Sequence, residues 1–170
     1  EYFWDEPRGG WYWRVARDGT LLDAGKVVYG QSFTVYALAQ YTLSTGDLRG
    51  LDYAARTFDL LQRYCADVAR GGYYENLEPD WMLSAGGWHA GDRKSLDIHM
   101  HLMECFTTLA RASGETIHRR RLEEVIDVIL HGRAPDTTLH ELGERVRDQL
   151  LQDENITQVE LSGLPPLEIG

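Results

Sequence analysis

The chain has 170 residues, a length that suits about one domain, and its 43% hydrophobic and 26% charged residues predict a globular core. Its net charge of −10 repels phosphate backbones and anionic headgroups, so neither nucleic acid nor a membrane surface is an expected partner. Cys65 and Cys105 match no disulfide or metal-binding spacing, and no apolar run approaches the roughly 18 residues of a membrane span. A cytoplasmic protein is therefore expected.

Two segments about 62 residues apart share one order of features. In the first, Gly9-Gly10 precedes an aromatic cluster, a polar turn and Lys26; in the second, Gly71-Gly72 precedes the same features and Lys94. These are the only two lysines of the chain, and a structural role at the junction of loop and helix is favoured over ligand contact.

Helices are predicted after each lysine, because apolar residues recur there with helical periodicity. The first pair spans about 28–45 and 48–69, and the second about 95–112 and 116–131. Each repeat is thus a short aromatic hairpin followed by two helices. Such pairs bury their apolar faces only by stacking, either as an open solenoid or as a closed toroid. We favour an all-α toroid whose loops gather at one end and hold the binding site.

The repeat is lost after about residue 132, and residues 133–170 carry three Arg against eight acidic residues. A helix is predicted over about 139–152 and a strand over 156–161. The predicted domains are therefore 1–132, a partial α/α barrel, and 133–170, an unrelated tail. Both ends of the chain read as cut, since it opens with aromatic residues and without Met and stops without a terminating element.

Aromatic residues crowd the predicted loops. Sugar rings stack their C–H faces on aromatic rings while their hydroxyls hydrogen-bond to charged groups, so these loops are expected to bind a small-molecule sugar. The alternative is that the rings pack the loops onto the barrel rim. The aromatic residues singled out as substrate-binding candidates are Trp11, Trp13, Tyr74 and Trp81.

A polar group lies on the otherwise apolar helix predicted over 95–112. Asp97, His101 and Glu104 share one face, whereas His99 points roughly 160° away from His101. A metal site is not expected, because no third ligand follows at useful spacing. A neutral histidine oriented by a carboxylate is favoured, with a satisfied core histidine as the alternative. His101 is the candidate catalytic residue, and Asp97 and Glu104 are candidate substrate-binding residues.

The same segments resemble the N-acylglucosamine 2-epimerase family, which includes cellobiose 2-epimerases and aldose–ketose isomerases. The resemblance covers residues 1–132, and its most specific part is Lys94-Ser-Leu-Asp97-Ile-His99-Met-His101-Leu-Met-Glu104. The other parts are Gly9-Gly10 to Lys26, Lys26-Val-Val-Tyr-Gly-Gln31-Ser-Phe33, Gly71-Gly-Tyr-Tyr-Glu75 and Asp80-Trp81. It implies an (α/α)6 barrel, of which this chain would hold about two of six units.

The chemistry that this resemblance implies is proton transfer at the carbon beside a sugar carbonyl, through an enediol intermediate and without a cofactor. His101 corresponds to a barrel-lining histidine that contacts the sugar, and Asp97 stands where relatives often have Asn. Family members usually have an Arg at the position of Phe33, where it would stabilise the developing oxyanion. Phe33 cannot donate a hydrogen bond. Two catalytic histidines belong to later repeats, so this chain is expected to be inactive alone.

Residues 134–170 resemble a different group, the porter region of resistance-nodulation-division efflux transporters, through Leu139–Asp148 and Ile156–Gly163. This second resemblance implies a fusion, frame change or artefact near Gly132. Two alternatives to an epimerase piece remain: a non-catalytic carbohydrate-binding module, and a fragment without a ligand. Self-association through exposed apolar helical faces is expected of a half-open ring.

Overall fold

A computed structural model describes residues 2–85 and 93–131 of the chain. The helix predicted over 139–152 and the strand predicted over 156–161 lie outside these residues. Everything described belongs to one compact unit that ends at His131.

Four helices carry the fold. They are α1 (Val28–Thr45), α2 (Leu48–Leu60), α3 (Leu96–Ser113) and α4 (Thr116–His131). A π-helical turn over Leu61–Cys65 continues α2. The four predicted helices are confirmed, except that the second stops at Cys65 and not at residue 69, because the next residue, Ala66, is extended.

The helix ends follow from local chemistry, and the C-terminal ends of α1 and α3 are alike in the two repeats. Gly46 and Gly114 end α1 and α3 in the left-handed conformation, and their amides donate to carbonyl oxygens one turn back. Asp47 and Ser95 cap α2 and α3 with side-chain oxygens that accept from Arg49 N and Ile98 N.

Strands are a minor part of the structure. The antiparallel pair β1 (Arg14–Val15) and β2 (Leu21–Asp23) forms a hairpin in the first loop. The second antiparallel pair joins β3 (Lys26–Val27) to β4 (Asn76–Leu77), so it connects the two repeats. The expected all-α class holds for the framework, while the loops contain these short strands.

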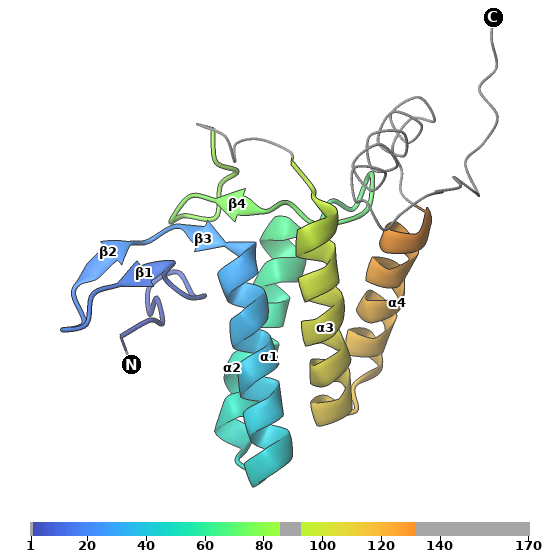
Figure 1. The fold of residues 1–170 in the computed structure, drawn as a ribbon, viewed down its shortest axis with the longest axis horizontal. Coiled ribbons are helices and arrows are strands. Elements are labelled where there is room, and N and C mark those ends of the chain that lie inside the picture. Colours follow the sequence, from blue (N-terminus) through green and yellow to red (C-terminus); the bar gives the residue numbers. More distant parts are fainter. Residues whose placement is uncertain (1, 86–92, 132–170) are drawn as a thin grey trace, which may run out of the picture. The chain divides into compact units, whose positions relative to one another are not determined.

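Helices α1 and α3 lie side by side, with α2 packed on α1 and α4 on α3 (Figure 1). The buried core between them is built from side chains such as Phe58, Leu61, Leu102, Phe106 and Leu109. This stacking of two helical pairs is consistent with a partial toroid. The loops connect to the starts of α1 and α3, so they gather at one end of the helices (Figure 1).

Some apolar side chains on the helices are exposed, including Leu48, Ile117 and Leu130. Self-association through such faces stays a prediction. None of the helices within the described residues is long and apolar enough to cross a lipid bilayer.

Each loop is fastened to the helix that follows it by a lysine–aspartate ion pair. Lys26 Nζ lies 2.8 Å from Asp5 Oδ2, with both side chains almost fully buried. Lys94 Nζ lies 2.5 Å from Asp67 Oδ2, with 19% of the lysine side chain exposed. The expected structural role of the lysines is confirmed by these pairs.

The same aspartates also shape the loops. Asp5 accepts from Gly9 N and donates its own amide to Gly10 O, and Asp67 does the same with Gly71 and Gly72. All four glycines have positive φ, which a residue with a side chain rarely adopts. A Cβ at Gly72 would also lie 2.7 Å from His99 Nε2. The paired glycines are therefore required both by conformation and by close packing.

Replacing Lys26 with Met is expected to lower the free energy of unfolding by about 3–5 kcal/mol, because it leaves the buried Asp5 carboxylate without a partner. Urea unfolding measures the effect. Arg49→Met is the control, since that arginine side chain is 85% exposed in its pair with Asp47 and its loss should cost far less. Equal effects of the two variants would contradict a stabilising role for the buried pair.

Candidate functional site

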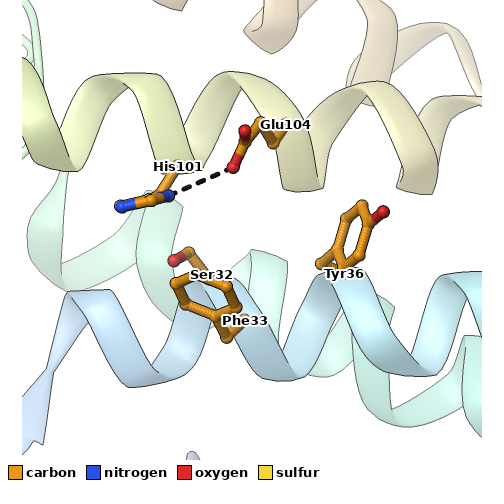
Figure 2. A pocket seen from close by; sticks show the side chains of 5 residues that line it. All are labelled: Ser32, Phe33, Tyr36, His101 and Glu104. Carbon is orange, nitrogen blue, oxygen red and sulfur yellow. Dashed lines mark hydrogen bonds and ion pairs between the residues drawn. The ribbon is translucent and has the colours of Figure 1, made fainter.

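A cavity of about 360 Å³ opens between α1 and α3. Figure 2 shows the side chains that line it facing one another across the two helices. Helix α1 contributes Ser32, Phe33 and Tyr36, and α3 contributes His101 and Glu104. The site therefore needs both repeats.

His101 lies between two carboxylates of its own helix. Its Nδ1 is 3.1 Å from Glu104 Oε2 and its Nε2 is 3.6 Å from Asp97 Oδ1. The predicted shared face of these three residues is confirmed. Because a carboxylate only accepts, the contact with Glu104 requires a proton on Nδ1. Nε2 faces the Asp97 carboxylate beyond hydrogen-bonding distance.

Aromatic rings of α1 surround the imidazole. The ring centroids of Tyr29 and Phe33 lie 4.8 and 4.9 Å from that of His101, and 4.9 Å from each other. With Tyr36 they form an aromatic stripe at i, i+4 and i+7 along α1. About 40% of each of these residues is exposed, so the stripe is accessible to a ligand.

The repeat explains why the two walls of the cavity match. Phe33 and His101 are 68 residues apart, as are Tyr36 and Glu104, and this is also the distance between the two lysines. Equivalent positions thus carry aromatic side chains on α1 and polar, ionisable ones on α3. Among the described lining residues, Glu104 supplies an anion and none supplies an arginine or lysine cation.

The second histidine of α3, His99, is held in the interior by backbone hydrogen bonds. His99 is buried, its Nδ1 lies 2.7 Å from the Ser95 carbonyl oxygen, and its Nε2 accepts from Tyr73 N at 3.0 Å. These partners fix the neutral tautomer with the proton on Nδ1, and burial lowers the pKa of His99. Gln31 takes the same place in the first repeat, where its Oε1 accepts from Trp11 N.

Most of the loop aromatics named as sugar contacts are engaged inside the protein. Trp81 is 4% exposed, stacks on Tyr64 and donates its indole N–H to the Arg8 carbonyl. The indole N–H of Trp11 donates to Thr57 Oγ1 at 2.9 Å. These partners indicate that the two tryptophans pack the loops onto the helices.

The other two predicted loop contacts differ from each other. Tyr74 donates its hydroxyl to Asp67 Oδ2, and the Lys94 ammonium lies 4.9 Å from its ring centroid. Trp13 is 39% exposed and lies against α1 at Gly30, where a Cβ would come within 3.1 Å of the indole. Of the four loop aromatics, Trp13 is the most available to a ligand.

Sequence reasoning missed the aromatic stripe and the two aspartate anchors. The stripe had a signal, because Tyr29, Phe33 and Tyr36 recur at helical spacing on one predicted face. The anchors had one too, since Asp5 and Asp67 each precede a glycine pair by four residues. Within residues 2–85 and 93–131, no group of three or more His, Cys, Asp or Glu side chains could hold a metal ion.

Comparison with known proteins gives one consistent relationship. The family described as N-acylglucosamine 2-epimerase matches residues 1–161. Cellobiose 2-epimerase of Bacteroides fragilis is 29% identical over 144 residues, which are 82% of this chain and 37% of the relative. The solved cellobiose 2-epimerase of Spirochaeta thermophila is 35% identical with a TM-score of 0.67, covering 75% of this chain and 33% of that one.

A more distant structural similarity supports the fold alone. The family 76 mannosidase of Bacteroides thetaiotaomicron is 19% identical with a TM-score of 0.60, covering 75% of this chain and 33% of that one. The chain spans about a third of the length of the relatives it matches.

The comparisons also bear on the tail. The family match continues to residue 161, well beyond the boundary predicted near 132. It therefore includes most of the segment that resembles efflux transporters. That second resemblance finds no support, and the separate origin of residues 133–170 stays a prediction.

Replacing His99 with Gln is expected to weaken the dependence of stability on pH. Because the folded state lowers the pKa of His99, the unfolded chain binds the proton more readily, and the free energy of unfolding falls as pH drops below about 6.5. The variant lacks the contribution of His99 to this fall in the free energy of unfolding, which amounts to at most about 1.4 kcal/mol per pH unit. His118, whose pKa burial also lowers, keeps its contribution in both proteins.

Urea unfolding at pH 7.5 and 5.5 measures this difference for the wild type and for His99→Gln. At pH 7.5 the variant should remain nearly as stable, because glutamine already accepts the equivalent loop amide in the first repeat. An unchanged loss of stability between the two pH values would show that His99 does not take up the proton.

Proposed function

Because the chain belongs to the N-acylglucosamine 2-epimerase family, we propose that it is part of a sugar 2-epimerase or aldose–ketose isomerase. The observation that carries the proposal is the cavity between α1 and α3, where an imidazole held by a carboxylate faces the aromatic stripe. A small uncharged sugar fits this combination of groups. The names of the relatives favour a disaccharide such as cellobiose.

The two walls suggest how a sugar would lie. The C–H face of a pyranose ring would stack on Phe33 and its neighbours in the stripe, since aromatic rings favour such contacts. The hydroxyl groups would then turn toward His101 and Glu104, which offer an imidazole nitrogen and a carboxylate. Asp97 and the exposed Trp13 are proposed as further contacts, whereas Tyr74, Trp11 and Trp81 act by holding the loops.

The proposed chemistry is proton transfer through an enediol. A base removes the proton from the carbon beside the carbonyl, while an acid protonates the carbonyl oxygen. Inversion at that carbon then needs a proton delivered to the opposite face of the enediol. His101 lies on one wall of the cavity, so it can serve one face at most. In this proposal His101 acts on one face of the enediol only, and the chain alone is proposed to be inactive.

A second candidate function is carbohydrate binding without catalysis. The exposed aromatic stripe favours it, because stacking on the stripe requires nothing from the missing acid–base partner. This function and the first one share the site but differ in whether the sugar exchanges its C2 proton.

Replacing Phe33 with Ala is expected to weaken the binding of cellobiose by about two- to tenfold, which corresponds to the loss of one stacking contact. NMR titration of the chain measures the affinity. Phe3→Ala is the matched control, since Phe3 is similarly exposed, at 48% against 43%, and lies outside the cavity lining. Equal affinities of wild type and Phe33→Ala would exclude the stripe as the sugar platform.

Incubation of the chain with cellobiose in deuterated water distinguishes catalysis by the chain from sugar binding without catalysis. No deuterium is expected at C2 above the blank, because the family resemblance assigns the two catalytic histidines to later repeats, which lie outside this chain. A single base would be enough for exchange, though not for inversion. Mass spectrometry of the recovered sugar gives the result. Incorporation that disappears in His101→Gln would overturn the proposed inactivity and make His101 sufficient for exchange.

A further inference from the structure

One residue contacts the first turns of both helices that form the cavity. Glu75 lies just before β4 and is 8% exposed. Its carbonyl oxygen accepts from Val28 N, the first residue of α1, at 2.9 Å. Its carboxylate accepts from Ser95 N, the N-cap of α3, and lies 3.5 Å from Arg93 Nε.

These contacts satisfy amides that helices leave without partners. The first N–H groups of a helix have no carbonyl within the helix, and an acceptor with negative charge stabilises that end. Val27, the N-cap of α1, supplies no side-chain acceptor, so the Glu75 carbonyl takes its place. A single residue therefore completes the start of α1 with its backbone and that of α3 with its side chain.

The cavity lies close to the starts of α1 and α3, so these contacts affect its residues. Tyr29 follows Val28 directly, and Phe33 and His101 lie within about two turns of the helix starts. We propose that Glu75 is a positioning residue, which sets the first turns of α1 and α3 side by side and so keeps the His101 imidazole against the aromatic stripe. Its effect on sugar binding rests on the proposed function, but its effect on the imidazole does not.

Three substitutions separate the hydrogen bond from the charge. Glu75→Gln keeps an oxygen at the same reach for Ser95 N and loses the ion pair with Arg93. Glu75→Asp keeps the charge but shortens the side chain by one carbon. Glu75→Ala removes both. If the bond to the start of α3 positions the helix, Gln should preserve the site while Asp and Ala should disturb it.

The NMR signals of the His101 imidazole report the position without any ligand. Tyr29 and Phe33 lie within 5 Å of it by centroid, so their ring currents displace its C–H resonances. His118 is an internal reference. It is held by Ser113 Oγ where α3 ends and α4 begins, at the opposite end of α3 from Ser95, and it packs on Phe58. In Glu75→Ala and Glu75→Asp we expect the His101 signals to move toward those of a free imidazole while the His118 signals stay. In Glu75→Gln both should stay.

Titration of the same variants with cellobiose adds a functional readout. Binding should weaken about tenfold in Glu75→Ala, the effect of losing one hydrogen bond to a charged group, and change less than about twofold in Glu75→Gln. The inference is overturned if the His101 signals stay in place in both Ala and Asp variants, if Gln moves them as much as Ala, or if His118 moves with His101. A wild-type chain that binds no cellobiose would instead overturn the proposed function, and the His101 signals would still decide the role of Glu75.

Discussion

The buried ion pair between Lys26 and Asp5 is the contact on which the loop end of the structure depends. Two charges removed from water are costly unless they meet each other in good geometry, and here they do so at 2.8 Å with almost no exposure. The aspartate also fixes the glycine turn, and the lysine begins the strand that leads into α1. One pair thus determines both the shape of the loop and the point at which the helix starts. The second pair, with Asp67, repeats this arrangement at the start of α3.

This repetition lets one framework carry two kinds of chemistry. The anchors, the helix ends at Gly46 and Gly114, and the loop acceptors Gln31 and His99 occupy equivalent places. Helices α1 and α3, which begin and end at these equivalent places, lie side by side. Phe33, Tyr36, His101 and Glu104 line the cavity but lie outside the buried apolar core, so these positions can differ between the repeats. An aromatic wall on α1 can therefore stand opposite a polar wall on α3, and a ligand with one apolar and one hydroxylated side finds a partner for each.

The helices were predictable because apolar periodicity reports directly which residues a helix buries, and the glycine caps fix where it stops. The shared face of Asp97, His101 and Glu104 followed from the same geometry. The loop aromatics were harder: composition cannot tell whether an indole faces a ligand or the core, and Trp81 is buried while Trp13 is exposed. The stripe on α1 was overlooked for a related reason. Helical spacing shows that its rings share a face, but only the packing of α1 against α3 shows that this face meets His101.

The second glycine of each pair limits how this architecture can change. At Gly72 a methyl group would meet the His99 ring, and at Gly10 it would meet the Trp81 ring at 2.5 Å. Neither ring has room to retreat, since each is held by hydrogen bonds in the interior. Mutational libraries aimed at new substrates can therefore vary the residues that line the cavity, whereas substitutions at Gly10 and Gly72 would prevent correct folding.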